Sequence, residues 1–166
     1  AEAKAYLEKT RIKTALTNQL IKVNDPGLGA LLMVKSSQME SQGIQFNLEI
    51  ANSLEDLPLK THDFSIILAN LLDNAIEAIH TEQPPQPEIS LEITKKYGIW
   101  YITVSNNGPA IKEETIDKLF QQGFSTKGEG RGMGLYIVKD LVEKNGGKIH
   151  VESNSGKTVF TISFPD

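Results

Sequence analysis

Polar side chains suited to binding a ligand follow one face of a helix that the sequence predicts over residues 61–80. Asp63, Asn70, Asn74 and Glu77 recur at helical spacing, opposite an apolar stripe. A solvated face is the ordinary explanation, but asparagine is a mediocre helix former, and solvated faces usually carry Lys, Glu or Arg. A carboxamide oxygen is a hard, neutral ligand that suits Mg²⁺. We predict that Asn74 is a metal ligand and that Asn70 contacts phosphate or a metal-bound water.

A second candidate site is a segment with glycine at every other position, followed directly by an amphipathic helical run. Glycine lets the backbone approach a ligand closely, and a helix that begins there directs free N–H groups and a positive dipole end toward it. This arrangement suits a polyphosphate, although a glycine-rich surface loop is the simpler alternative. The residues of this segment are Gly130, Arg131, Gly132, Met133, Gly134 and Leu135.

A third candidate is the end of a predicted strand over residues 99–105, where Asn106 opens a turn that contains Gly108. Polar residues that follow a strand often mark a ligand site, and a carboxamide can accept a hydrogen bond from an exocyclic amine as well as donate one. The alternative is that Asn-Gly is only a turn former.

A loop between this turn and the glycine segment carries two cations, Lys127 and Arg131, beyond the aromatic residues Phe120 and Phe124. It is either a basic surface loop or a lid, hinged on the two aromatics, whose cations meet a triphosphate when it closes.

Composition narrows the class of protein. The 166 residues suffice for one domain with a core, and 39% are hydrophobic. The net charge of −4 leaves no basic footprint, so we expect no nucleic-acid partner. The absence of cysteine excludes disulfides and thiolate metal sites. No apolar run reaches membrane-spanning length, and the chain starts with Ala inside a helical pattern. We expect an excised piece, with any membrane anchor outside it.

Hydrophobic periodicity predicts helices separated from a run of antiparallel strands, which indicates a two-layer α+β sandwich. The helices are expected at 1–23, 28–42, 61–80, 112–120 and 133–145, and the strands at 44–50, 88–96, 99–105, 148–153 and 158–164. In the first helix, Ile12, Leu16, Leu20 and Val23 share one face. That face fits an ordinary docking helix or half of a helical dimerisation hairpin, and we favour the hairpin.

In this order, the four segments resemble the catalytic ATP-binding domain of sensor histidine kinases in the GHKL superfamily. Residues 70–75 resemble its N box, 106–111 its first glycine box, 120–127 its F box and 130–135 its second glycine box. The resemblance covers about residues 25–166. Features such as Asp25-Pro26 further resemble the citrate/dicarboxylate sensor branch.

The resemblance implies a Bergerat fold that binds ATP and Mg²⁺, with Asn74 on the metal and Asn106 at the adenine. It implies γ-phosphoryl transfer to a histidine on a dimerisation helix outside this chain. Residues 1–24 would be the second helix of a truncated dimerisation hairpin, and 25–166 the catalytic domain. The implied partners are the protein's own dimerisation domain, a second copy of the full-length chain and a response regulator. The implied location is the cytoplasmic side of a bacterial membrane protein.

Hydrolysing members of the superfamily carry a water-activating Glu where this chain has Asn70, which cannot take a proton near neutral pH. We therefore expect phosphoryl transfer by alignment and charge neutralisation, with Asn70, Lys127 and Arg131 as the catalytic residues beside Mg²⁺.

Three departures from the family pattern keep other readings open. Asn106 replaces the usual Asp, Ala110 replaces a glycine and would be strained at a positive φ, and Glu77 stands where many members carry a basic residue. The alternatives are a degenerate, non-catalytic scaffold or phosphorelay module, and a GHKL ATPase or anti-sigma serine kinase. His62-Asp63-Phe64 resembles a phosphoacceptor box, but Ile66 stands where that box carries Asn, so we expect no acceptor histidine here.

Overall fold

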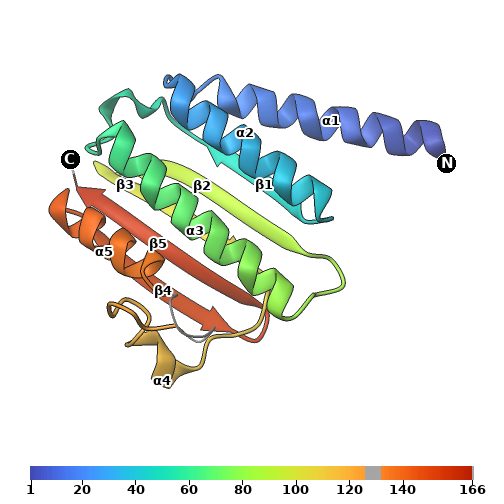
Figure 1. The fold of residues 1–166 in the computed structure, drawn as a ribbon. Coiled ribbons are helices and arrows are strands. Elements are labelled where there is room, and N and C mark those ends of the chain that lie inside the picture. Colours follow the sequence, from blue (N-terminus) through green and yellow to red (C-terminus); the bar gives the residue numbers. More distant parts are fainter. Residues whose placement is uncertain (126–131, 166) are drawn as a thin grey trace.

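The computed structural model describes residues 1–125 and 132–165 and has the predicted two-layer α+β architecture (Figure 1). Its helices are α1 (Glu2–Leu20), α2 (Pro26–Ser41), α3 (Thr61–Thr81), α4 (Glu113–Ile116) and α5 (Gly134–Lys144), with a short 3-10 helix η1 at Leu54–Asp56. Its strands are β1 (Gln45–Ile50), β2 (Glu88–Lys96), β3 (Ile99–Asn106), β4 (Lys148–Asn154) and β5 (Lys157–Pro165).

The strands form one sheet in the order β1-β2-β3-β5-β4. Strands β1 and β2 are parallel, and the other neighbouring pairs are antiparallel. Helices α2, α3 and α5 lie side by side over one face of this sheet (Figure 1). Because the helices cover one face of the sheet, side chains alternate between buried and more exposed positions over most of β2, β3 and β5.

Helix α3 occupies the middle of the helical layer and supplies most of that layer's core. Every apolar position of its stripe is buried, and the stripe is broader than predicted because Ile67 and Ile76 join it. The buried residues are Phe64, Ile67, Leu68, Leu71, Leu72, Ala75, Ile76 and Ile79. Burying one side against the sheet leaves the polar side of α3 facing away from the core, where it can line a cavity.

Several element boundaries differ from the predicted ones for local reasons. Helix α2 begins two residues early because Asp25 caps it, accepting a hydrogen bond from the Leu28 N–H at 2.8 Å, with Pro26 in the first turn. The helix expected over 112–120 is a single turn, α4, followed by turns. The 3-10 helix η1 was not predicted.

Helix α1 has no buried residue, and its amino-terminal end extends beyond α2 (Figure 1). Its carboxyl-terminal end is attached to the edge of the sheet. The Gln19 side chain accepts a hydrogen bond from the Ile50 N–H at 2.8 Å, and Lys22 Nζ donates to the Ile50 carbonyl at 2.6 Å. On the predicted apolar face Val23 is buried, whereas Ile12 is half exposed. The helix is thus tied to the domain at this end, where Leu20 packs against the core without being fully buried.

None of the described helices is long and apolar enough to cross a membrane.

Candidate functional site

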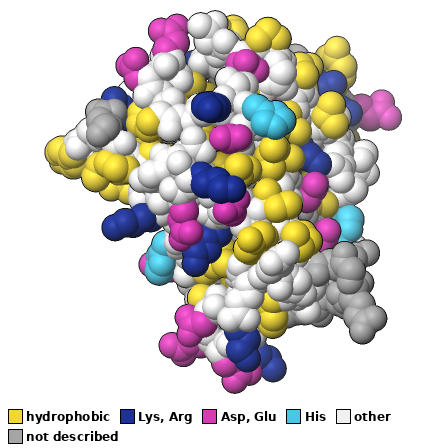
Figure 2. All heavy atoms as spheres, turned by 60° about the vertical axis from the view of Figure 1, so that its left-hand side comes forward, with side chains coloured by type: hydrophobic (Ala, Val, Ile, Leu, Met, Phe, Trp, Pro, Cys, Tyr) yellow, Lys and Arg dark blue, Asp and Glu magenta, His cyan; other side chains and the backbone are white. Residues whose placement is uncertain are grey.

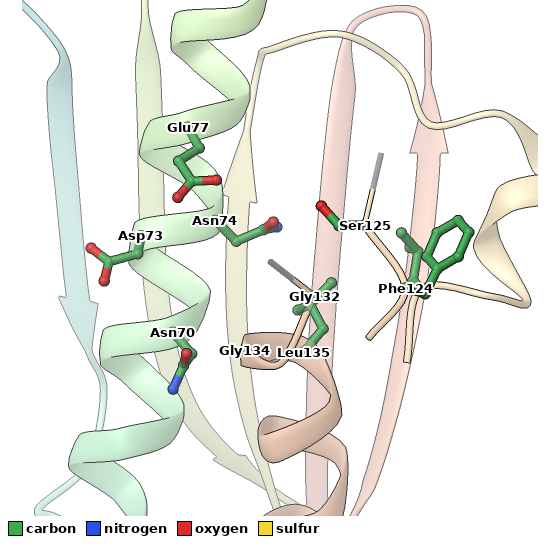
Figure 3. Close-up of a pocket in the computed structure, with 10 residues that line it drawn as sticks. Asn70, Asp73, Asn74, Glu77, Phe124, Ser125, Gly132, Gly134 and Leu135 are labelled. Carbon is green, nitrogen blue, oxygen red and sulfur yellow. The ribbon is translucent and has the colours of Figure 1, made fainter. Parts of the chain in front are cut away.

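Two adjoining cavities lie between the polar side of α3, the amino-terminal end of α5 and the loops that flank them. The smaller has a volume of about 310 Å³, and Figure 3 shows its lining residues. The larger, of about 480 Å³, extends toward the end of β3. Asn74, Leu119 and Leu135 line both cavities, which makes them two compartments of one site.

Asn70 projects from α3 into the smaller cavity (Figure 3). Its Nδ2 donates to the Ile66 carbonyl one turn earlier, at 2.8 Å. This bond orients the amide, so the Oδ1 atom is the one directed toward the opposite wall, where a Cβ added to Gly134 would lie 2.8 Å from it. Of the two contacts predicted for Asn70, an acceptor oxygen suits a metal-bound water better than it suits phosphate.

Asn74 lies one turn further along α3 and points across the cavity toward the segment at Ser125 and Gly132 (Figure 3). Its side chain is half buried and makes no hydrogen bond to any residue that the structure describes. A partly enclosed carboxamide without a protein partner is unusual, because polar groups that leave water normally find one. Asn74 is therefore available for a ligand or a metal ion.

The opposite wall of the smaller cavity is the beginning of α5, where Gly134 and Leu135 line the space. The capping residue Met133 provides no side-chain hydrogen bond to the first turn, and its own side chain is exposed. Among the residues that the structure describes, no side chain caps the N–H groups of that turn, and an anion is the species that such groups favour.

Gly132 brings this wall close to the loop that ends at Ser125. Its φ is +104°, and a Cβ there would lie 2.1 Å from the Phe124 carbonyl oxygen. Only glycine fits such a position. The requirement for glycine in the predicted anion-binding segment is thus partly a matter of packing between two loops.

The larger cavity ends at the turn after β3. Asn106 is 3% exposed and lines the cavity, and its Oδ1 accepts a hydrogen bond from the Gly108 N–H at 3.0 Å. Gly108 itself packs against the backbone of Ala78 in α3, from which an added Cβ would stand 3.0 Å away. Ala110 also lines the cavity, and its φ is not positive, so the expected strain is absent.

Hydrogen bonds to the start of β2 and to a side chain of β4 hold this turn in place. The Asn107 side chain accepts from the Glu88 N–H at 2.8 Å and donates to the Gln86 carbonyl at 2.7 Å. The Ile111 N–H donates to Ser153 Oγ at 2.8 Å, and that hydroxyl shares a 2.6 Å hydrogen bond with Thr158. These bonds fix the polar end of the larger cavity to the sheet.

The predicted lid falls mostly outside the described residues, and so do Lys127, Gly130 and Arg131. Within the described part, the Phe120 ring packs edge-on against Phe160 of the sheet, with ring centroids 6.4 Å apart, whereas Phe124 lines the smaller cavity. The two aromatic residues proposed as hinges thus have different roles: one is anchored in the core and the other faces the site.

Sequence reasoning did not assign several residues that line the two cavities. Asp73, which directly precedes Asn74, borders the smaller cavity and forms an ion pair with Lys35 of α2. Position 73 carries a polar residue next to the predicted asparagine face, which was a usable signal. Thr158 gave no such signal, because the alternation in a strand does not show which of its side chains line a cavity. The other unassigned lining residues include Leu119, Ser125, Ile111 and Thr115.

Among the described residues no group of three or more His, Cys, Asp or Glu side chains could hold a metal ion. A site built on one carboxamide and on ligand phosphates needs no such group, because Mg²⁺ is commonly bound through few protein atoms plus substrate oxygens.

The fold and the site together define a nucleotide-binding domain of a known class. A family pattern described as "Histidine kinase-, DNA gyrase B-, and HSP90-like ATPase" matches residues 60–166. The chain belongs to this family, and ATP is the nucleotide associated with it.

Sensor kinases are similar over most of the chain. A probable C4-dicarboxylate sensor kinase of Halalkalibacterium halodurans is 37% identical over 149 residues, covering 87% of this chain and 28% of that protein. Sensor histidine kinase DcuS of Escherichia coli is 36% identical over 166 residues, covering 95% and 30%. The chain thus spans about 30% of the length of these relatives.

Solved structures agree with the family assignment. The nucleotide-free catalytic domain of histidine kinase ThkA superimposes with a TM-score of 0.70 at 30% identity, covering 83% of this chain and 89% of that one. Together with the two sensor kinases, it confirms the predicted resemblance to histidine kinase catalytic domains and to the dicarboxylate and citrate sensors.

Proposed function

We propose that this chain is the catalytic domain of a sensor histidine kinase, which binds Mg²⁺-ATP and transfers its γ-phosphoryl group to a histidine outside the chain. The observation that carries the proposal is that Asn74, which has no hydrogen-bond partner among the described residues, lies across one small cavity from the amino-terminal turn of α5. A triphosphate between these walls would meet N–H donors on one side and a metal ligand on the other.

The residues around this cavity fit a magnesium ion held at Asn74, with the Oδ1 atom of Asn70 directed toward the same space. When bound, Mg²⁺ supplies charge neutralisation at the phosphate oxygens. Asn74 orients the phosphate chain, and the first turn of α5 holds the terminal phosphate by its N–H groups. We propose that Lys127 and Arg131 supply the rest of the positive charge that neutralises the triphosphate.

The position of Asn70 favours transfer over hydrolysis. Its amide is committed to the Ile66 carbonyl, and an amide does not accept a proton near neutral pH. A water molecule beside Asn70 would therefore lack the general base that hydrolysis needs at this place. Multiple-turnover phosphate release by the isolated chain would instead support the ATPase alternative.

For the whole protein, we propose a homodimer anchored in the bacterial membrane by parts outside this chain, with its own dimerisation domain and a response regulator as partners. The exposed apolar side chains of α1, among them Tyr6 and Leu7, support a role for residues 1–24 as half of a dimerisation hairpin that lacks its neighbour here.

The test is nucleotide binding with and without magnesium, in wild type and in Asn74→Ala. With a fluorescent ATP analogue we expect Asn74→Ala to weaken binding at least about tenfold in Mg²⁺ and to change it little in EDTA, because only the metal contact is lost. Asn47→Ala, which removes the same group from the exposed face of β1, serves as the matched control and should bind normally.

Two results would count against the proposal. Equal weak binding by wild type and Asn74→Ala would favour the degenerate scaffold. Covalent labelling of the isolated chain by γ-labelled ATP would place an acceptor inside it, contrary to the assignment of the acceptor to another segment.

A further inference from the structure

The larger cavity has the character of a nucleobase compartment. Its walls are mainly apolar, with Pro109, Ile111 and Leu135 among them, and few polar groups converge at its sheet end. Since it adjoins the compartment between Asn74 and α5, a nucleotide with its phosphates there would place its base here. This inference rests on the proposed function and concerns which base the site accepts.

Asn106 is the buried polar residue at the end of this compartment, and its orientation follows from its hydrogen bond. The Gly108 N–H can donate only to the oxygen of the amide, so Oδ1 faces the turn at 3.0 Å. Nδ2 must then point the other way. It has no hydrogen-bond partner among the described residues, and it is not one of their fully enclosed unpaired atoms. An N–H donor is therefore available at the wall of the base compartment.

The second polar group, the hydroxyl of Thr158, does not restrict the choice of base. It shares its hydrogen bond with Ser153, and either oxygen can be the donor. A hydroxyl can turn to donate or to accept. Thr81, Lys112, Glu114 and Thr115 line the compartment too, but they are not buried. Of the two buried polar residues, Asn106 is therefore the one with a fixed hydrogen-bonding character.

Purines differ at the edge that such a group would read. A 6-amino purine presents an amine donor beside a ring acceptor, whereas a 6-oxo purine presents an oxygen acceptor beside a ring N–H. A carboxylate in place of the Asn106 amide would have acceptor oxygens only. One of these oxygens would then face the acceptor oxygen of a 6-oxo purine, with no hydrogen between them. The Asn106 amide has a free donor at Nδ2 and a second lone pair on Oδ1, so it can match either edge.

We propose that this site does not discriminate strongly between purine nucleoside triphosphates, and that Asn106 is the residue responsible, so that 6-oxo purine nucleotides bind alongside ATP. The turn that holds Asn106 is fixed to the sheet, which keeps the amide in place for both bases.

The experiment compares the dissociation constants of ATP and inosine triphosphate by calorimetry in Mg²⁺, since hypoxanthine differs from adenine only at the edge in question. Guanosine triphosphate adds the 2-amino group as a second probe. For the wild type we expect the dissociation constants of inosine triphosphate and ATP to agree within about tenfold. In Asn106→Asp we expect the ratio of these constants, inosine triphosphate over ATP, to rise at least about tenfold.

Asn154→Asp is the matched control. Asn154 makes the same turn, its Oδ1 accepting from the Gly156 N–H at 3.0 Å, but it is exposed on the β4–β5 hairpin and lines neither compartment. Asn154→Asp introduces the same negative charge away from the base compartment. Its ratio of dissociation constants, inosine triphosphate over ATP, should therefore equal that of the wild type.

Three outcomes would overturn the inference. One is a wild type that already prefers ATP by more than about a hundredfold. Another is an unchanged ratio in Asn106→Asp when that variant still binds ATP. Failure of every purine nucleotide to bind would refute the proposed function itself, and the inference with it, whereas the first two outcomes leave the nucleotide site intact.

Discussion

At the scale of single residues, the close approach of two backbone segments shapes the smaller cavity. Gly132 lets the segment before α5 lie against the Phe124 carbonyl, and Gly134 leaves room for the Asn70 amide. Gly29 in α2 is different, because a Cβ there would meet nothing within 4 Å. The chain therefore contains glycines that the site requires and at least one that the fold does not.

This contrast yields a paired prediction. We expect Gly132→Ala to weaken ATP binding at least about tenfold, because an added Cβ 2.1 Å from a carbonyl oxygen must displace the loop. Gly29→Ala should raise the free energy of unfolding by about 0.5–1 kcal/mol through helix propensity and leave binding unchanged. Calorimetry measures the ATP affinity of both variants, and urea unfolding measures their free energy of unfolding. Normal binding by Gly132→Ala would show that the loop does not shape the site.

At the scale of elements, an ion pair joins α2 to the helix that carries the asparagines. Lys35 of α2 contacts Asp73 of α3, and the two side chains are 14% and 51% exposed. The lysine is thus much more enclosed than its partner. Removing one partner of an ion pair is costly mainly when the remaining charge is withdrawn from water.

We therefore expect Asp73→Ala to destabilise the domain more than Lys35→Met does. Asp73→Ala leaves an enclosed ammonium group without its partner and should lower the unfolding free energy by about 1–2 kcal/mol, against about 0–1 kcal/mol for Lys35→Met, whose carboxylate partner remains hydrated. Urea denaturation of both variants and of the double variant gives the coupling free energy between Lys35 and Asp73. Equal losses would mean that the ion pair is as hydrated as a surface pair.

At the scale of the whole molecule, α1 is a long helix of which no residue is fully buried. Besides the contacts of Gln19 and Lys22 at its end, α1 has an exposed ion pair in its first half, between Lys9 and Glu40 of α2 at 3.0 Å. Elsewhere on the surface, acidic and basic side chains are interspersed on the face shown in Figure 2, in keeping with the small net charge of −4. A loosely held helix with apolar residues outward is suited to pairing with another helix.

The Lys9–Glu40 pair makes the docking of α1 sensitive to acid. The hydrogen bond from Lys9 lowers the pKa of Glu40 below its ordinary value of 4.5. A lowered folded-state pKa means that the contact contributes fully above pH 4.5 and is lost as the pH falls through the lowered value. We expect amide exchange in the first half of α1 to increase slightly in that acidic range.

Glu40→Gln should show the same increase in amide exchange of α1 already at pH 7, because the negative charge that pairs with Lys9 is gone. Glu8→Gln is the control, since the partner of Glu8 is Arg11 on the same helix. If Glu8→Gln and Glu40→Gln behave alike, the contact between α1 and α2 does not hold the helix.

Much of the fold was predictable because periodicity follows from which side of an element meets the core. The alternation in β2, β3 and β5 and the stripe of α3 led to the correct layers and placed Asn70 and Asn74 on the polar side. Local chemistry was less visible. The Asp25 cap moved the start of α2, and the predicted helix over 112–120 proved to be one turn.

What the sequence determined by itself was the order of the four candidate segments and the polar side of the helix that carries Asn70 and Asn74, because both depend on residues close together in the chain. Only the tertiary structure decided which partner each side chain meets. Asp73 is paired by a lysine 38 residues away, and Asn106 turns its oxygen to Gly108 and leaves its nitrogen for the cavity. Those choices depend on distances between elements that packing brings together, which no local pattern encodes.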